Sequence, residues 1–212
     1  MEKLNKYQND DKKEKNDLKN ENTYLWMEND NTDIIWNEKD DQPNHADLKT
    51  HGITDFLWRT VFDSIRRHAV DVTLDPDTAN PHLILTEDGK QVRFGDIELD
   101  LPDNPERFNY CPNVLGKEGF SSGRFYYEIR VKGNTEWIVG VAIPTLLSLR
   151  EKPQKVGVFV DYEEGQVSFF IVETRSHICS FTGQDFTDKL YPFFSLGYDL
   201  FPLVICPLDV TD

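Results

Sequence analysis

From Val70 onward the chain consists of short runs rich in Val, Ile, Phe and Tyr, separated by Gly, Pro, Asp and Asn. The runs follow one another at roughly 8–12 residues, with hairpin-type turns and no helical period between them. This spacing predicts an all-β, antiparallel sandwich or barrel. The expected strands are 82–86, 91–94, 123–131, 137–142, 155–162, 166–172, 177–181 and 203–206.

The stretch VDYEEGQVSFF at 160–170 places three acids and a glycine between two apolar runs. Glu163, Glu164 and Gly165 are expected to connect two strands, because Gly supplies a positive φ and the acids stay hydrated at a turn. Two adjacent acids at a turn point apart, whereas a glycosidase needs two carboxylates facing each other across a groove. We therefore expect a structural hairpin here. Asp161, inside a strand, is expected to accept hydrogen bonds from the loop backbone.

Residues 51–69 carry a helical period and are expected to form one amphipathic helix before the sandwich. Its apolar face should pack on the domain that follows. The expected apolar stripe is Ile53, Leu57, Val61 and Ile65, widened by Phe56 and Phe62.

Residues 1–50 have a different composition, because 30 of these 50 positions are Asp, Glu, Lys or Asn. Such a segment buries too little apolar area to offset an ordering cost of roughly 1–2 kcal/mol per residue. We expect a disordered tail that contributes little to the fold. Two apolar islands, 24–27 and 34–36, are candidate docking motifs within it.

The formal charge of −15 divides into −5 in residues 1–50, +1 in 51–69 and −11 in 70–212. No segment offers the Lys/Arg stripe that nucleic acid or an anionic membrane requires, so a partner with a basic or apolar surface is favoured. The N-terminus has no apolar signal region and no run is long enough to span a membrane. We expect a cytoplasmic protein without membrane insertion.

The three cysteines, Cys111, Cys179 and Cys206, show no CxxC spacing, which argues against a zinc finger, a RING or a disulfide framework. They are expected to be reduced and to be buried structural thiols. The five histidines show no HExxH pattern, and the chain has no GxSxG, P-loop, GxGxxG or EF-hand loop. We therefore expect no metal, no cofactor and no catalytic residues, so the chain is not expected to be an enzyme.

Three ordered segments share a recognisable pattern. They are VDVTLDPDTANPHLILTEDGKQVRFGD (70–96), ERFNYCPNVLGKEGFSSGRFYYEIRVKGNTEWIVGVA (106–142), and LSLREKPQKVGVFVDYEEGQVSFFIVETRSHICSFTG followed by KLYPFFS. Together they resemble the PRY–SPRY domain of tripartite-motif proteins, butyrophilins and related fish immune receptors, over residues 66–208. The resemblance implies a bent, concanavalin-like jelly-roll sandwich at 70–212, with PRY at about 70–120 and SPRY at about 121–208. The matching motif residues are Leu74, Asp75, Pro76, Tyr127, Glu128, Trp137, Asp161, Tyr162 and Glu163; Trp137 itself is expected to belong to the core.

The resemblance implies a module that recognises a protein partner through its loops and performs no catalysis. By family analogy, its setting would be innate immune or ubiquitin-linked signalling. No Cys/His cluster or heptad repeat of a ligase is present in the sequence. The expected partner contacts are Asn109, Tyr110, Pro112, Asn113, Lys132, Asn134, Glu136, Tyr198, Leu200 and Phe201.

The sequence departs from the family pattern after Ala142, where only Ile143–Leu147 intervenes before the next motif. The family normally has a variable loop and two or three further strands there. This internal deletion is expected to remove part of the contact surface. It is also expected to leave Ile138, Val156 and Phe159 uncovered and to open a sheet edge to self-association.

Two other function classes remain open. A lectin-like or hydrolytic β-sandwich acting on glycans would need exposed aromatic rings beside a carboxylate or amide cluster. A fragment of a pore-forming toxin is disfavoured, because the membrane-active part of such toxins lies outside the resembling segment.

Overall fold

The computed structural model describes residues 58–102, 104–141, 145–147, 153–198 and 201–207. For 145–147 the description covers the backbone alone. The expected tail at 1–50, and the first residues of the expected helix, lie outside the described residues.

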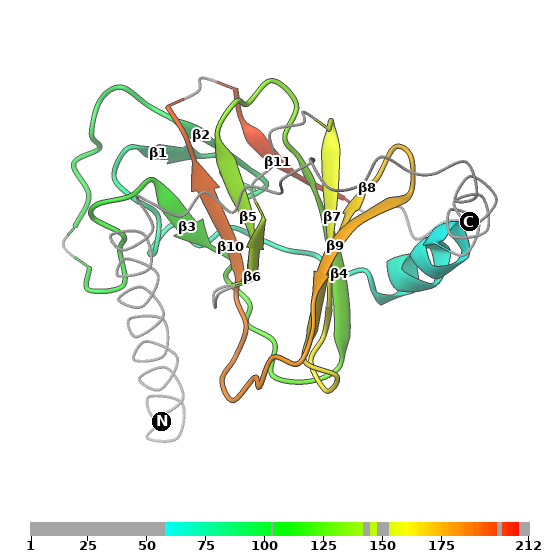
Figure 1. The fold of residues 1–212 in the computed structure, drawn as a ribbon. Helices are drawn as coiled ribbons and strands as arrows, with labels where there is room; N and C mark the ends of the chain where they lie inside the picture. Colours follow the sequence, from blue (N-terminus) through cyan, green and yellow to red (C-terminus); the bar gives the residue numbers. More distant parts are fainter. Residues whose placement is uncertain (1–57, 103, 142–144, 148–152, 199–200, 208–212) are drawn as a thin grey trace, which may run out of the picture.

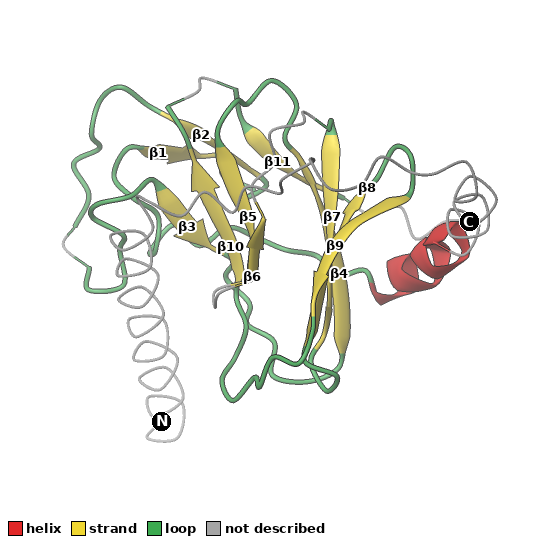
Figure 2. Cartoon of the chain, viewed as in Figure 1, coloured by secondary structure: helices red, strands yellow, loops and turns green. Residues whose placement is uncertain are grey.

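The described residues form two antiparallel sheets packed face to face (Figures 1 and 2). The larger sheet has seven strands in the order β1-β2-β11-β4-β7-β8-β9, and the smaller has four in the order β3-β10-β5-β6. The strands are β1 (Leu83–Leu85), β2 (Gln91–Phe94), β3 (Asn113–Leu115), β4 (Arg124–Arg130), β5 (Trp137–Val141), β6 (Thr145–Leu147), β7 (Lys155–Asp161), β8 (Gln166–Ile171), β9 (Ser176–Phe181), β10 (Pro192–Leu196) and β11 (Leu203–Cys206). The predicted all-β, antiparallel sandwich is confirmed.

The main core lies between the two sheets and receives every second side chain of the long strands. In β7, Val156, Val158 and Val160 point into this core, while Phe159 points to the opposite face of the sheet. On the smaller sheet, Val139 and Phe194 close the core from the other side. Burying a side chain of this size contributes roughly 1.5–3 kcal/mol, so the alternation of side chains fixes which face of each strand turns inward.

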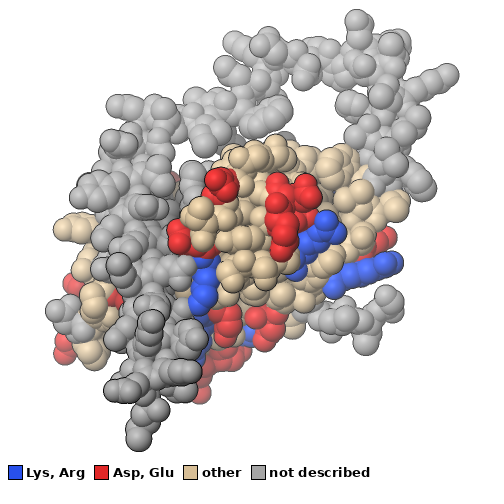
Figure 3. Space-filling model, turned by 90° about the horizontal axis from the view of Figure 1, so that it is seen from below, with Lys and Arg blue, Asp and Glu red and all other residues tan. Residues whose placement is uncertain are grey.

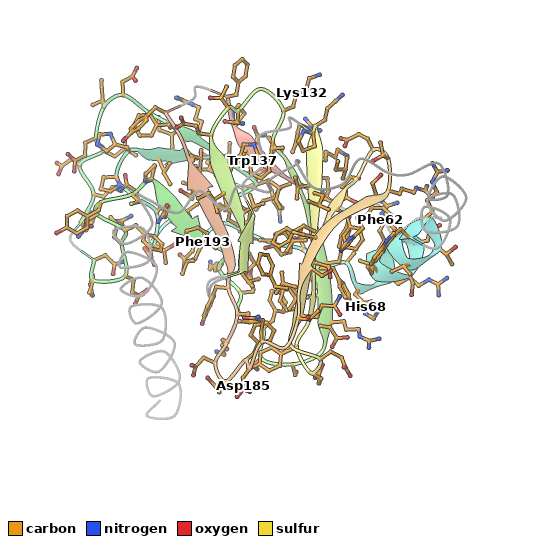
Figure 4. All side chains as sticks on the ribbon, in the orientation of Figure 1. Phe62, His68, Lys132, Trp137, Asp185 and Phe193 are labelled. Carbon is orange, nitrogen blue, oxygen red and sulfur yellow. The ribbon has the colours of Figure 1, made fainter. Side chains whose placement is uncertain are left out.

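A helix at 58–65, followed by a 3-10 turn η1 (Arg66–His68), covers the outer face of the larger sheet. Phe62 is fully buried and meets Tyr126 and Phe170 edge to face at ring-centroid distances of 6.0 and 5.6 Å. Figure 4 shows Phe62 where the helix meets the sheet. The helix thus forms a third layer with its own aromatic core.

The predicted apolar stripe of this helix is partly wrong. Val61 is 41% exposed, whereas Trp58, Phe62 and Ile65 pack on the sheet. These three residues are also spaced by one helical turn, but their stripe is rotated around the helix relative to the predicted one. The two aromatic rings offer more area to bury than Val61, and the sheet beneath presents aromatic partners.

A buried carboxylate connects the helical segment to the sheet. Glu128 is buried, and its Oε1 lies 3.4 Å from Nε of Arg66 and accepts a hydrogen bond of 3.1 Å from the Tyr126 hydroxyl. Nζ of Lys155 lies 3.9 Å from Oε2. Burial raises the pKa of Tyr126 well above its ordinary value, and the negative charge of Glu128 raises it further. A buried charge is tolerated only with partners of this kind.

The eight predicted strands are all present, and three strands were missed. β3 and β6 have only three residues each, too few to show an alternating pattern. β10 begins at Pro192, and a proline argues against an interior strand from sequence alone. Pro192 is tolerated because it is the first residue of β10, where it pairs with Val141.

The prediction that the shortened segment uncovers Val156 and Phe159 is wrong. Val156 is fully buried in the main core, and Phe159 is 8% exposed beneath Phe62 and Ile65. The helix covers Phe159 on the outer face of the sheet, while Val156 is covered by the smaller sheet. Ile138 is half-buried against the cluster around Phe193, and β6, within the shortened segment, pairs with β5.

Candidate partner-binding surface

Three loops meet at one end of the sandwich, which we call the aromatic end. They are 131–136 between β4 and β5, 197–202 between β10 and β11, and 107–112 before β3. The amide of Gly197 donates to the carbonyl of Glu136 at 2.8 Å, and the amide of Leu196 donates to the carbonyl of Pro112 at 3.1 Å. The first bond joins the 131–136 and 197–202 loops at the end marked by Lys132 in Figure 4, and the second ties the residue before β3 to the end of β10.

The turn at Gly133 holds two of these loops together. Gly133 has φ +93, and an added Cβ there would lie 2.8 Å from Cγ of Phe201. The Phe201 ring therefore lies directly on the glycine backbone, a close approach that only Gly permits. Beside it, the buried amide of Asn134 donates to the carbonyl of Pro202 at 3.3 Å and to that of Val131 at 3.5 Å.

Three aromatic side chains are exposed on these loops. Tyr110 and Tyr198 are each 77% exposed, and Phe201 is 57% exposed. Tyr198 meets the buried Phe94 edge to face at a centroid distance of 5.0 Å. An aromatic ring that is held by a contact beneath it, while most of its surface stays in water, offers binding area at a low entropic cost.

The expected partner contacts divide by exposure. Exposed are Asn109, Tyr110, Lys132, Glu136, Tyr198 and Phe201, and Pro112 is half-buried. Asn113 and Asn134 are buried, so neither presents a contact surface in this conformation, and we leave both out of the surface. Asn113 lies inside β3 opposite Ser195, and Asn134 is used by the loop clamp. Leu200 lies outside the described residues.

Sequence reasoning missed a run of exposed aliphatic side chains after β2. Ile97 is 80% exposed, and Leu99 and Leu101 are also exposed. The amide of Leu99 donates to the carbonyl of Pro81. The ring of the next residue, His82, stacks on Phe94, and Phe94 in turn contacts Tyr198. The run therefore extends the aromatic end. The sequence signal that could have revealed this run is its alternation of acidic and aliphatic residues, DIELDL at 96–101.

The motif residues of the first segment form a turn that supports β3. Leu74 bridges to Gly116, and the amide of Asp75 donates to the carbonyl of Leu115 at 2.9 Å. The carboxylate of Asp75 accepts the amide of Asp77 at 3.1 Å, with exposed Pro76 at the corner of the turn. This geometry gives the Leu-Asp-Pro sequence a structural role.

The motif residues of the second segment lie in the core. The Tyr127 hydroxyl donates a short hydrogen bond to the carbonyl of Gly140, which links the two sheets. Burial raises the pKa of Tyr127, so it remains a neutral donor. Trp137 is 4% exposed, which confirms its predicted place in the core.

The opposite end of the sandwich, which we call the acidic end, contains the 162–165 turn and the 182–189 loop (Figures 1 and 4, where Asp185 is labelled). The predicted hairpin is confirmed, since β7 and β8 pair up to Asp161 and Gln166 and Gly165 has φ +59. Figure 3 shows this face, where acidic side chains stand beside a few basic ones.

The carboxylates of the hairpin bind neighbouring donors. Asp161 accepts the amide of Glu164 at 3.2 Å, as expected, and also Nε of Arg124 at 2.6 Å. Glu163 was expected to be hydrated, but its Oε1 also accepts the amide of Gly123 at 2.7 Å. The Tyr162 hydroxyl donates to the carbonyl of Asp188 at 3.0 Å. These contacts tie the turn to its neighbours.

The cysteines carry no disulfide in the described residues. Cys206 is buried, while Cys111 and Cys179 are only half-buried, and burial raises the pKa of all three thiols. Within the described part of the chain, no helix combines the length and the apolar character needed to cross a membrane.

The two antiparallel sheets packed face to face place the chain in the class of β-sandwich proteins. Family models narrow the class: a PRY (SPRY-associated) model matches residues 72–120, and a SPRY model matches 143–201. The chain belongs to the PRY–SPRY family, whose domains are protein-interaction modules.

Curated relatives agree with this family. The chain is 41% identical to "Butyrophilin subfamily 1 member A1" of Bos taurus, with 68% of the chain and 34% of the relative covered. It is 39% identical to "Zinc finger protein RFP" of Homo sapiens, with 68% and 36% covered. It is 40% identical to the human "Erythroid membrane-associated protein", with 70% and 38% covered. The chain thus spans little more than a third of these relatives.

Two solved structures share the fold. The TRIM65 PSpry domain has a TM-score of 0.62 at 19% identity, with 70% of this chain and 95% of that chain covered. The stonustoxin structure has a TM-score of 0.58 at 22% identity, with 68% and 30% covered. At these identities the likeness concerns the fold alone.

The alignments to relatives also support the internal deletion. The bovine butyrophilin alignment spans 179 positions but covers 68% of this chain, and 68% of 212 residues is about 144. About 35 aligned positions, the difference between 179 and 144, therefore have no counterpart in this chain. The alignment to the RFP protein spans 183 positions at the same coverage, which leaves about 39 without a counterpart.

Proposed function

We propose that this chain is a non-catalytic recognition module that binds a protein partner through its aromatic end. The observation that carries the proposal is the exposure of Tyr110, Tyr198 and Phe201 on two loops, 107–112 and 197–202, that a hydrogen bond from Leu196 to Pro112 holds together. Aromatic residues dominate the energetics of protein interfaces, at about 2 kcal/mol or more for the strongest positions. Asn109, Pro112, Lys132 and Glu136 form the rim of the contact.

The partner is proposed to present an apolar patch with basic residues around it. Residues 70–212 have a net charge of −11, and the run at 96–101 adds three acids between its exposed aliphatics. Opposite charges across an interface speed association and select against acidic partners. By family analogy, we propose a cytosolic role in innate immune or ubiquitin-linked recognition.

A glycan-binding function has less support. Trp137, the strand tryptophan that a sugar ring would stack on, is buried. The carboxylates of Asp161 and Glu163 accept hydrogen bonds from neighbouring chain segments, which is a structural use.

The proposal is tested by affinity purification of the full chain followed by mass spectrometry. The test variant carries Tyr198→Ser and Phe201→Ser, and the matched control carries Glu163→Gln and Glu164→Gln at the acidic end. A protein retained by the wild type and the control, but lost with the test variant, supports the aromatic end as the binding surface. Retention by all three chains, with equal thermal stability, contradicts it.

A further inference from the structure

The larger sheet ends in an edge strand without a described partner. β9 (Ser176–Phe181) pairs with β8 alone among the described strands, and its six residues make it the longest edge strand there. β1 and β6 have three residues each, and β3 is capped by the preceding turn. In that cap, the amides of Asp75 and Asn80 donate to the carbonyls of Leu115 and Asn113.

The chemistry of β9 is unusual for an exposed edge. Its sequence SHICSF contains no Lys, Asp, Glu or Pro, the residues that normally discourage pairing with another strand. Ile178, Cys179 and Phe181 pack against the main core but are only partly buried. A strand laid along this edge would complete their burial and satisfy the outward backbone groups of β9.

The chain itself brings a segment to this edge. Trp58, the first described residue, stacks on the imidazole of His177 in β9, with ring centroids 4.0 Å apart and an interplanar angle of 4°. The helix that follows is fixed by Phe62 and Ile65 on the same sheet. Residues 1–57 are therefore joined to the described fold at a residue that already contacts β9.

One short stretch of those residues has the composition of a strand. Ile34 and Ile35 are the only isoleucines in residues 1–50, which contain no valine, and Trp36 follows them. β-Branched and aromatic residues are the types enriched in strands. The 14 residues from Trp36 to Thr50, before the predicted helix, have a root-mean-square span of about 20 Å as a flexible chain, similar to the length of β9 at roughly 3.3 Å per residue.

We propose that residues 32–36 add as a strand to the free edge of β9 and cover Ile178, Cys179 and Phe181. A tether of this length gives an effective concentration in the millimolar range, so a weak pairing is sufficient. The acids around the segment, at 28, 30, 33, 38, 40 and 41, would then lie along the new edge and provide the charge that β9 lacks. The tail would protect an edge without being required for the sandwich to fold.

The test compares three full-length chains: the wild type, Ile34→Asp with Ile35→Asp, and a matched control, Leu25→Asp with Met27→Asp, which places the same two charges in the other apolar island. The first readout is amide hydrogen exchange in β9. The second is the alkylation rate of Cys179, with Cys111 at the aromatic end as an internal reference, since both thiols are half-buried. We expect at least tenfold faster exchange in β9 and several-fold faster alkylation of Cys179 in the Ile34/Ile35 variant alone, with Cys111 unchanged.

A peptide of residues 30–38, added to the Ile34/Ile35 variant, should restore the protection of β9, which also excludes misfolding as the cause. Equal rates in the three chains would overturn the proposal. Protection that grows with protein concentration would also overturn it, because a second copy would then cover β9. Loss of protection in the Leu25/Met27 control would equally overturn it, because another segment would then be the occupant.

Discussion

The two ends of the sandwich are built from the same kind of strand connections but treat their aromatic residues in opposite ways. At the acidic end, Tyr162 packs against Phe186, and Phe120 stacks on Phe125 at 4.2 Å. Each of these rings is at least partly buried. At the aromatic end, Tyr198 and Phe201 keep more than half of their surface in water.

The difference separates loops whose polar groups bind inside the fold from loops that we propose to contact a partner. The acids of the acidic end look like a catalytic cluster in the sequence, but Asp161 and Glu163 hold local backbone groups and Arg124. At the aromatic end the side chain of Asn134 donates the hydrogen bond that joins two loops, and the aromatic rings stay exposed to water. The exposure of large apolar groups is therefore the reason for proposing the aromatic end as the contact surface.

The largest effect is expected from a change beneath the aromatic end. Trp137→Ala removes a nearly fully buried side chain at the start of β5 and should lower the free energy of unfolding by about 3–5 kcal/mol. Tyr198→Ala, as the control, should change it by less than about 0.5 kcal/mol. Urea unfolding measures both. Similar losses for the two variants would remove the distinction between a buried support and exposed contacts.

An intermediate effect is expected at the turn of the acidic end. Gly165→Ala places a Cβ against the carbonyl of Gln184 at a residue with φ +59, whereas Gly183→Ala meets only the left-handed backbone at φ +72, with open space around it. We expect about 1–2 kcal/mol of destabilisation for Gly183→Ala and a larger loss for Gly165→Ala. Thermal melts of the two variants provide the comparison. An equal loss at both glycines would show that the loop moves away from the turn.

The smallest effect is expected from the acids themselves. Glu163→Gln with Glu164→Gln keeps an oxygen that can accept the Gly123 amide, and exposed charges contribute less than about 1 kcal/mol. The double variant should melt within a few degrees of the wild type and retain any partner. If the wild type turned over a glycoside and this variant did not, the acidic end would be catalytic after all.

The strand pattern could be predicted from the sequence because alternation and turn residues are local signals. The hairpin at 160–170 is an example, since each of its two strands places alternate apolar residues in one core. The three missed strands are short or begin with proline, and only their pairing partners make them strands. The rotated stripe of the helix has a similar cause, because the rings of Tyr126 and Phe170 beneath it favour Trp58 and Phe62 over Val61.

The loops of the candidate surface could be predicted, but which of their residues are exposed could not. The family resemblance points to 109–113 and 132–136 as variable loops and to contacts at 198–201. It cannot show that Asn113 lies inside a strand or that Asn134 donates to Pro202. It also gives no sign that the 96–101 run joins Tyr198 through Phe94 and His82. Exposure depends on contacts between residues distant in the chain, and such contacts have no local sequence signal.

The sequence by itself determined the all-β class, the family and the two faces of most strands, because side-chain alternation and turn chemistry act over a few residues. The tertiary structure decided which side chains are exposed at each end, how the helix covers Phe159, and that β9 has no described partner on its outer edge. These features depend on which surfaces meet when the sheets pack. Only then is it decided which apolar side chains leave water and contribute free energy of burial.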